Sequence, residues 1–382
     1  MKRGVIFSTG LGRGGAETQL MRVARELVAR GVRVTVVSLL DKNLWEEELA
    51  ESGIAYRCLH FTRGRPSAAG FARALALLVR ERPCVVLSFL TAANVLARVA
   101  APLAGVPAVV SSVRSIVSGS SRKSKYEFFL ANRDHAVVFN ARCIADDAIA
   151  RGLLEPSRAR VLRNALDLDA FDARASEAAR AGLREEAGVG DADFVWISVG
   201  NVRPVKNMSS LVRAFRRVHK DWPNARLWVV GRHYEDYPTA LEAAGDLVDA
   251  GVVRFWGLRQ DIPELLSAAD AFALASHREG TPNAVIEAHA AKLPVAATRV
   301  GGTPEVLEDG VSGWMIDAPT DDAIELTLRE AMATEQRKRA SMGLAGRARV
   351  EREHAAPALL DAWVELLSAA ARGDVVASNA GP

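Results

Sequence analysis

The segment FALASHREGTPNAVIEAHAAKLPVAATRVGGTPEVLEDGVSGWMID, residues 272–317, combines residue types that suit a ligand with hydroxyl and phosphate groups. An apolar run leads into a polar loop that contains Glu279, Gly280 and Thr281, and Glu287 follows with seven residues between the two carboxylates. A carboxylate beside an anion site repels phosphate unless it faces a neutral group, and a sugar diol donates the two hydrogen bonds that a carboxylate accepts. We therefore expect these carboxylates to face hydroxyl groups.

The same loop leads into a helix predicted from about Asn283 to Ala291. We expect Asn283 to be the N-cap, and the N–H groups of Ala284 and Val285 to be the first free donors. A helix start beyond a strand combines free donors with a positive dipole end. This position therefore predicts an anion site.

Cations follow another apolar run in VGNVRPVKN, residues 199–207. Arg203 and Lys206 lie beyond the end of the predicted strand, where they would neutralise negative charge on a leaving diphosphate. The alternative for either residue is ordinary surface charge.

The stretch STGLGRGGAETQL, residues 8–20, has a glycine pattern typical of a phosphate-binding loop. Three interpretations remain: a dinucleotide site with Asp41 on the ribose, a plain turn, or a loop whose backbone closes over phosphates held by the other half of the chain. We favour the last, with Gly14 and Gly15 at the phosphates, because glycine lets backbone N–H groups approach closely. The other signals for a nucleotide lie after residue 198, and one nucleotide needs one site.

Two series of apolar runs alternate with amphipathic stretches along the chain. The first comprises GVIFST, RVTVVSLL, CVVLSFL, PAVVSSV and HAVVFN, and the second FVWISVG, ARLWVVG, VVRFWG, AFALAS, LPVAATRVGG and GWMID. Such runs are typical of parallel strands covered on both faces. They predict an α/β protein with two Rossmann-like domains, residues 1–165 and 166–355, that face each other across a cleft. We expect a helix at 356–373 to join the first domain, and a linker with a short helix at 164–190.

The composition excludes several classes of protein. The chain has 382 residues, 49% of them hydrophobic, which disfavours disorder. Its three cysteines have no C-x-x-C spacing, which argues against a disulfide framework or a structural zinc site. The sequence has neither a signal-peptide pattern nor an apolar run long enough for a membrane span, and we expect a cytoplasmic protein.

Charge is unevenly distributed between the two halves. Residues 1–165 contain 25 Lys and Arg against 13 Asp and Glu, whereas residues 166–382 contain 24 against 33. A basic N-terminal half favours an anionic acceptor or a membrane surface, and an Arg-rich surface without a partner is the alternative. The predicted membrane-docking face comprises Arg57, Arg63, Arg65, Arg73, Arg80, Arg82, Arg122, Lys123, Lys125, Tyr126, Phe128 and Phe129. An amphipathic helix with core aromatic residues would explain its aromatic part equally well.

These motifs together resemble glycosyltransferase family 4. The resemblance rests on the Glu-x7-Glu pair with VGGTPEVLEDGVSGW, on GGAET at 14–18, on VLRNALDLDAF at 161–171 and on VGNVRPVKN at 199–207, which follow in the family's order over nearly the whole chain. It implies a retaining enzyme with the GT-B fold and no metal. In that family the first carboxylate, here Glu279, contacts the donor sugar, and the second, Glu287, contacts the nucleotide ribose. The amides of Asn283, Ala284 and Val285 would hold the diphosphate.

The resemblance also implies roles elsewhere, and the chain departs from the family's pattern at two places. Lys206 matches the family's lysine, and the backbones of Leu258 and Arg259 would read the base. Asn201 stands where many members have an arginine, so we expect Arg203 to substitute. Arg114 stands near the position of the family's acceptor-side histidine, where it would hold an acceptor phosphate or the donor diphosphate.

The sequence thus predicts transfer of a hexose or N-acetylhexosamine from a nucleotide-diphosphate sugar, with UDP favoured, to a glycan or lipid-linked acceptor. His277 adjoins the site and is expected to contact the sugar or stabilise charge. We expect no cofactor and no nucleic-acid partner, with peripheral contact to the inner membrane face through the basic half. The alternatives are a sugar-nucleotide epimerase, a phosphorylase, an NAD(P)-dependent oxidoreductase and an inactive binding subunit.

Overall fold

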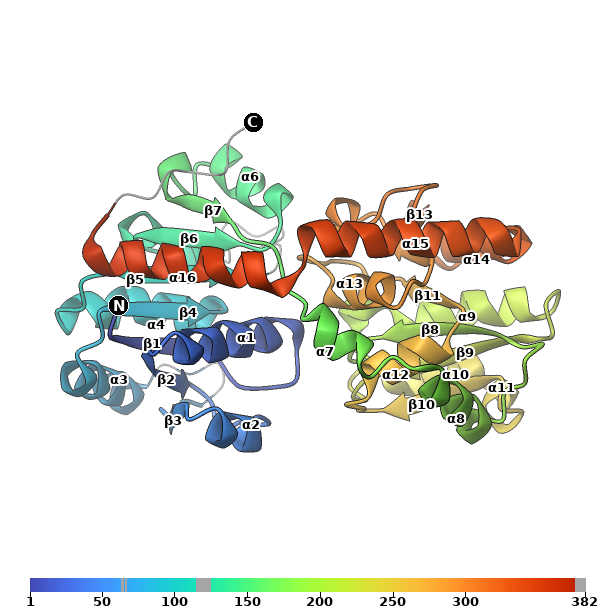
Figure 1. Ribbon diagram of the computed structural model, residues 1–382, viewed down its shortest axis with the longest axis horizontal. Coiled ribbons are helices and arrows are strands. Elements are labelled where there is room, and N and C mark those ends of the chain that lie inside the picture. The colour runs from blue at the N-terminus through green and yellow to red at the C-terminus, as the bar shows by residue number, and fades with distance from the viewer. Residues whose placement is uncertain (63–64, 66, 115–124, 375–382) are drawn as a thin grey trace. The chain divides into compact units, whose positions relative to one another are not determined.

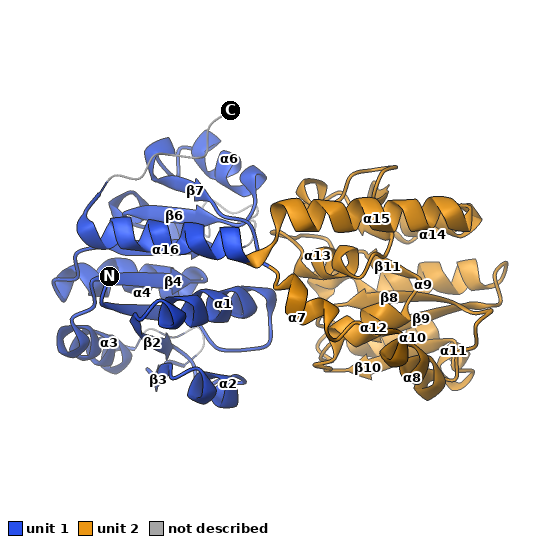
Figure 2. Ribbon diagram, in the orientation of Figure 1, with its two compact units in different colours: residues 1–165, 357–382 blue, residues 166–356 orange. Residues whose placement is uncertain are grey.

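The computed structural model describes residues 1–62, 65, 67–114 and 125–374, and it divides into two compact units (Figures 1 and 2). Unit 1 comprises Met1–Ala165 and Pro357–Pro382, and unit 2 comprises Leu166–Ala356. Each unit has its own parallel sheet and its own buried core. None of the helices formed by the described residues is long and apolar enough to cross a membrane.

Unit 1 is built on a seven-stranded parallel sheet with the order β3-β2-β1-β4-β5-β6-β7. Its strands are β1 (Arg3–Ser8), β2 (Arg33–Ser38), β3 (Ala55–Cys58), β4 (Val85–Phe89), β5 (Val109–Val113), β6 (Ala136–Phe139) and β7 (Ala159–Val161). Its described helices are α1 (Gly15–Ala29), α2 (Glu46–Glu51), α3 (Ala68–Glu81), α4 (Thr91–Leu103), α6 (Arg142–Ala150) and α16 (Ala356–Arg372), with the short 3-10 helices η1 (Ala131–Arg133) and η2 (Pro156–Arg158).

The strands of unit 1 are apolar at nearly every position because helices cover both faces of the sheet. Along β1, Ile6 packs in one layer with residues of α1 and α16. Its neighbours Val5 and Phe7 point to the other layer, with residues of α3 and α4. Successive side chains of a strand alternate between faces, so a strand buried on both sides must be apolar throughout.

Unit 2 has a six-stranded parallel sheet with the order β10-β9-β8-β11-β12-β13. Its strands are β8 (Phe194–Val199), β9 (Ala225–Val230), β10 (Val253–Gly257), β11 (Ala271–Leu274), β12 (Val295–Thr298) and β13 (Gly313–Ile316). Its helices are α7 (Leu168–Asp172), α8 (Glu177–Ala187), α9 (Met208–His219), α10 (Tyr237–Ala244), α11 (Asp246–Asp249), α12 (Ile262–Ala268), α13 (Asn283–Ala290), α14 (Asp321–Ala333) and α15 (Gln336–Glu353), with 3-10 helices η3 (Pro204–Lys206) and η4 (Thr303–Glu305).

Both sheets have the strand order of the doubly wound α/β fold. The order reverses between β1 and β4 in unit 1, and between β8 and β11 in unit 2. Ligands of such folds bind outside the carboxyl ends of the strands at this reversal. The prediction of two Rossmann-like sheets is therefore confirmed, and the reversal in each sheet is the place to look for a site.

Two features of the chain were not predicted. The sequence patterns singled out neither β3 nor β7, which are the short edge strands of unit 1. The region 164–190, expected to be a linker with a short helix, forms the two helices α7 and α8. α8 packs against α12, and so this region belongs to the body of unit 2.

Candidate functional site

Lys206 and Glu279 meet at the carboxyl edge of the sheet in unit 2. Lys206 ends η3, which follows β8, and Glu279 lies in the loop that follows β11. Because β8 and β11 are neighbours at the reversal, residues 73 positions apart are brought together, with 2.6 Å between Lys206 Nζ and Glu279 Oε1. The side chain of Glu279 is 9% exposed and that of Lys206 27% exposed. The pair is thus shielded on the carboxylate side and open on the ammonium side.

A buried serine completes this contact. Ser276 Oγ donates a hydrogen bond of 2.5 Å to the same oxygen, Glu279 Oε1. Among the described residues, no hydrogen bond involves Glu279 Oε2, and Lys206 Nζ has N–H groups beyond the one used here. The arrangement therefore keeps an acceptor and donors available to a ligand.

Backbone hydrogen bonds tie the loops of this edge together. His277 N donates to the carbonyl oxygen of Val205 at 2.9 Å, which joins the loops after β11 and β8. Gly302 N donates to the carbonyl oxygen of Gly280 at 2.7 Å, which joins the loop after β12. The side chain of His277 is exposed, next to the Lys206–Glu279 pair in sequence but without a recorded contact to it among the described residues. The site is thus built on three mutually braced loops.

The helix that follows this loop begins where the sequence predicted, but its N-cap is a different residue. α13 starts at Asn283, and Pro282, rather than Asn283, is the N-cap, with no side-chain cap. The N–H of Val285 donates to the carbonyl oxygen of Pro282 at 3.1 Å, so the expectation that this N–H is free is wrong. Glu287 lies one turn beyond Asn283 on the same side of the helix and is half-buried.

A second helix starts at this edge of the sheet, and a carboxylate of the protein already caps it. α9 also begins after the reversal loop, but Ser209 N donates to Asp236 Oδ2 at 3.1 Å. A carboxylate at a helix start satisfies a donor and offsets the positive dipole end. No side chain of the described residues caps the start of α13, which makes it the better position for an external anion.

Arg203 and Asn201, also in the loop after β8, pack against the loop after β9. The guanidinium of Arg203 lies 4.0 Å from the ring centroid of Tyr234. Asn201 Oδ1 accepts a hydrogen bond from Arg232 N at 3.3 Å. The structure therefore places the side chain of Lys206, but not that of Arg203, in direct contact with Glu279.

The predicted base-binding loop follows β10. Leu258 is 44% exposed. Arg259 forms a two-pronged ion pair with Asp261 and lies 4.9 Å from the ring centroid of Trp256. The hydrogen bonds to Asp261 raise the pKa of Arg259, and the same contact lowers the pKa of Asp261. The side chain of Arg259 is thus committed within the loop, so only its backbone remains for a base.

The glycine loop lies in unit 1, between β1 and α1. Gly14 is the N-cap of α1 and Gly15 its first residue, with no side-chain cap. The carboxylate of Glu17 lies so close that a Cβ atom on Gly14 would be 2.6 Å from its Oε2. An acidic group beside this helix start opposes binding of phosphate there, which weighs against the dinucleotide interpretation and equally against the predicted contact of Gly14 and Gly15 with donor phosphates.

Arg114, the predicted acceptor-side residue, follows β5 in unit 1. Its Nη1 donates to Asn164 Oδ1 at 2.8 Å, and its guanidinium lies 4.9 Å from the ring centroid of Phe89. Of the predicted docking face, Arg63, Arg122 and Lys123 lie outside the described residues. Tyr126 and Phe129 are about half exposed and Phe128 is buried, so its aromatic part divides between surface and core.

Sequence reasoning missed two residues that position this site. Ser276 holds Glu279, and its place as the last, polar residue of the run AFALAS was a usable signal. Tyr234 lies under Arg203, and no pattern in the sequence indicated this contact.

Known proteins share both halves of this architecture. A family model for glycosyl transferases group 1 matches residues 180–349, and a model for the glycosyl transferase 4-like domain matches residues 14–165. The chain is 28% identical over 294 residues to a D-inositol 3-phosphate glycosyltransferase of Segniliparus rotundus, covering 73% of this chain and 64% of that protein. It is 31% identical over 163 residues to the N-acetyl-α-D-glucosaminyl L-malate synthase of Bacillus anthracis, covering 41% and 42%.

A solved structure supports the fold. The Anabaena protein Alr3699/HepE, crystallised with UDP and glucose, superposes with a TM-score of 0.84 at 21% identity, over 96% of this chain and 100% of that one. The aligned regions span less than two-thirds of either curated relative. The two family models, however, lie on the two units in the expected order and together match most of the chain. The chain therefore belongs to the glycosyl transferases group 1 family and has its two-sheet GT-B fold.

Proposed function

We propose that this protein is a retaining glycosyltransferase that moves a hexose or N-acetylhexosamine from a nucleotide-diphosphate sugar, with UDP favoured, to an anionic or lipid-linked acceptor. The observation that carries the proposal is the contact between Lys206 and Glu279 at the strand reversal of unit 2, beside the uncapped start of α13. A cation, a carboxylate and an anion-favouring helix start are the three groups that a nucleotide-diphosphate sugar requires.

Each group has a proposed role. Glu279 accepts hydrogen bonds from sugar hydroxyls through Oε2, while Ser276 and Lys206 hold Oε1 in place. Lys206, with Arg203 as a second cation, stabilises the negative charge that develops on the leaving diphosphate. Glu287, one turn into α13, accepts hydrogen bonds from the ribose. The bond between the anomeric carbon and the phosphate oxygen breaks, and the departing phosphate takes the proton of the attacking acceptor hydroxyl on the same face.

The donor and acceptor classes are supported by the relatives. Alr3699/HepE was crystallised with UDP and glucose, which supports a UDP-sugar. The names of the two curated relatives include malate and inositol 3-phosphate, both of which carry acidic groups. An acidic acceptor suits the excess of Lys and Arg in residues 1–165. We propose that the reaction needs no metal, because Lys206 and the start of α13 supply the positive charge.

Thermal unfolding in the presence of UDP, GDP, ADP, their sugar conjugates and NAD(P), each with and without a chelator, tests the donor assignment. We expect a rise in Tm with one nucleotide and its sugar that persists with the chelator. The rise should be lost in Glu287→Ala and Lys206→Ala and kept in Lys220→Ala, which removes an exposed lysine of the same unit. A response to NAD(P) alone, or to none of these ligands, would overturn the proposal.

Product analysis separates the remaining alternatives. A transferase consumes the donor faster when an acceptor is present, an epimerase converts the sugar without one, and a phosphorylase requires free phosphate. A product with inverted anomeric configuration would exclude the retaining mechanism. It would leave the proposed donor site unaffected.

A further inference from the structure

Two arginines beside β5 have buried guanidinium nitrogens in unit 1, and they differ in their partners: Arg98 is buried as a whole, whereas Arg114 is partly exposed but its Nε and Nη2 atoms are buried. The side chain of Arg98 is 0% exposed, with Nε 2.8 Å from Asp134 Oδ2 and Nη2 2.6 Å from Ser111 Oγ. Its Nη1 donates to the carbonyl oxygen of Glu127. Every nitrogen of this guanidinium therefore has an acceptor, and its charge has a carboxylate.

Arg114 is not satisfied in this way. Nη1 donates to the neutral amide oxygen of Asn164, while Nε and Nη2 are buried and have no hydrogen-bond partner among the residues that the structure describes. The rings of Phe89 and Trp363 lie 4.9 and 5.6 Å from its guanidinium carbon. Burial lowers the pKa of Arg114 to about 9, so the group is still a cation at neutral pH. Buried donors without acceptors are rare, and an unpaired buried charge is costly.

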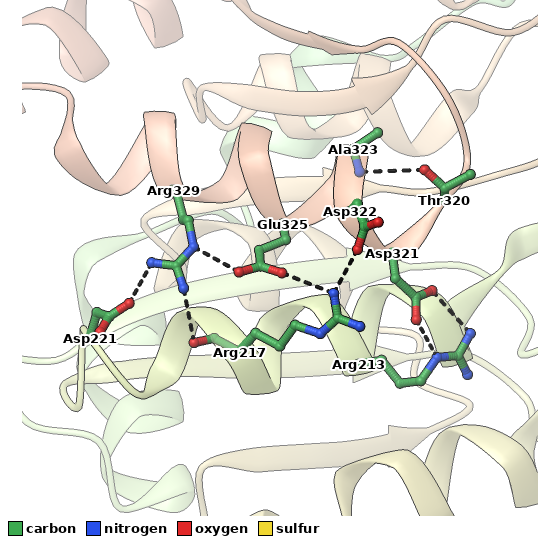
Figure 3. A network of polar contacts seen from close by, with 9 residues as sticks. All are labelled: Arg213, Arg217, Asp221, Thr320, Asp321, Asp322, Ala323, Glu325 and Arg329. Carbon is green, nitrogen blue, oxygen red and sulfur yellow. Dashed lines mark hydrogen bonds and ion pairs between the residues drawn. The ribbon is translucent and has the colours of Figure 1, made fainter.

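The two nitrogens without a partner form a fork. Nε–H and Nη2–H lie on the same edge of the planar guanidinium, and together they match two oxygens of a carboxylate or phosphate. Arg213 in unit 2 shows this mode with its partner in place: its Nε is 2.6 Å from Asp321 Oδ2 and its Nη2 is 3.1 Å from Asp321 Oδ1 (Figure 3). Arg114 presents the same edge without the carboxylate.

The position of this fork suits a ligand. Arg114 directly follows β5, at the carboxyl edge of the sheet, and β5 pairs with β4 at the strand reversal. We propose that unit 1 contains an oxyanion subsite in which the Nε and Nη2 groups of Arg114 bind a phosphate or carboxylate group of the acceptor. That the anion belongs to an acceptor rests on the proposed function, whereas the subsite itself rests on the geometry of Arg114.

Anion-dependent thermal unfolding of the full chain tests this subsite. One arm adds inorganic phosphate and the other adds malonate, with ionic strength held constant by sodium chloride. We expect a saturable rise in Tm with at least one of them, and the stronger response identifies the class of oxyanion. In Arg114→Met the concentration for half of the effect should rise by about tenfold or more, because a charge-assisted two-pronged contact is lost.

Three further variants sharpen the test. Arg114→Lys keeps the charge without the fork and should also bind more weakly. Arg33→Met removes an exposed cation of the same unit and should bind as the wild type does. Lys206→Met removes the cation of the donor site, which can itself bind phosphate. The response that remains in this variant should be the part that depends on Arg114, and adding Arg114→Met to it should remove that part. Without anions, Arg114→Met should unfold at the same temperature as the wild type or higher, because it removes an unpaired buried charge.

The outcomes are separable from those of the donor screen. The subsite is overturned if Lys206→Met gives no saturable response to either anion, or if its response is the same when Arg114→Met is added. A marked fall in the Tm of ligand-free Arg114→Met would also overturn it, because that result would show a structural role. If phosphate acts through Arg114 while no nucleotide sugar binds, the subsite stands and the proposed function fails.

Discussion

The cation at the carboxyl edge of unit 2, Lys206, has a carboxylate 2.6 Å away. The guanidinium at the carboxyl edge of unit 1, Arg114, donates to a single acceptor among the described residues, the side-chain amide of Asn164. Lys206 also keeps much of its exposure to water, while the Nε and Nη2 atoms of Arg114 are buried. A paired, hydrated cation costs little stability when no ligand is bound. An unpaired buried cation lowers the stability of the fold until an anion binds to it. In the absence of ligands, the cation of unit 1 is therefore expected to be more destabilising than the cation of unit 2.

The largest expected effect compares the two buried arginines of unit 1. Arg98→Met leaves Asp134 buried without its partner and should lower the free energy of unfolding by about 3–5 kcal/mol. Arg114→Met should lower it little or raise it, since no carboxylate loses a partner. Urea unfolding of both variants in the absence of anions measures the difference. Equal losses of stability in the two variants would contradict the view that Arg114, unlike Arg98, does not stabilise the ligand-free fold.

The next effect concerns the paired cation of unit 2. Lys206→Met should reduce the turnover number by about 10²–10³, because it removes charge stabilisation at the leaving group. Its Tm should fall modestly, because the shielded carboxylate of Glu279 loses its cation while Ser276 still donates to it. Steady-state assays with the nucleotide sugar identified by the screen measure this, with Lys220→Met as the matched control. A variant with full turnover would show that Lys206 only positions Glu279.

A buried histidine behind the donor site gives unit 2 a dependence on pH. His289 on α13 is fully buried, and burial lowers its pKa from 6.5 to about 4. Between pH 6.5 and 4 the unfolded chain takes up a proton that the folded chain does not, so this residue makes stability fall as pH falls. A shift of about 2.5 pKa units corresponds to about 3 kcal/mol.

Denaturant unfolding at a series of pH values between 4 and 7 tests this dependence. His289→Leu should flatten the fall that this residue contributes, whereas Val285→Ala, at a buried position of the same helix without a titratable group, should lower stability without changing its slope with pH. The same steepness in wild type and His289→Leu would show that other groups cause the acid sensitivity.

The smallest effect concerns backbone strain at the reversal of unit 1. Leu90 precedes α4 with φ 74° and ψ 150°, a conformation otherwise confined almost entirely to glycine. Leu90→Gly should relieve strain while losing side-chain packing, and we expect a net change within about 1 kcal/mol, against about 2–5 kcal/mol for a usual buried Leu truncation. Calorimetry of this variant beside Leu87→Ala, a fully buried neighbour, measures both values. Losses of the same size would show that Leu90 is not strained.

Central strands of the two sheets were easier to predict from the sequence than edge strands. Central strands such as β1 and β8 are apolar at most positions, because helices cover both faces, and this pattern was readable from the sequence. β3 alternates between exposed and partly buried residues and β7 has three residues, so neither produced a clear run. α8 was underestimated because only Leu183 and Arg184 of its residues are buried, which leaves a polar composition.

At the donor site, residue types were predictable and contacts were not. Glu279, Glu287 and Lys206 were proposed from motifs. The helix start at Asn283 was predicted correctly, but the N-cap was assigned to Asn283, whereas Pro282 takes that position. The hydrogen bond from Val285 N to the carbonyl oxygen of Pro282 depends on the local backbone geometry. The contact of Arg203 with Tyr234 depends on a loop 31 residues away. Neither is encoded in the spacing of the motif itself.

The sequence by itself determined the two parallel sheets, the family and the residue types that suit a nucleotide sugar, because apolar periodicity and loop motifs are local along the chain. Only the tertiary structure decided which of these residues meet. Strand order brought Lys206 to Glu279 across 73 positions, and packing buried the Nε and Nη2 atoms of Arg114 where no carboxylate of the described part of the chain pairs with them. Such pairings depend on where distant strands end in space, and no local pattern specifies that.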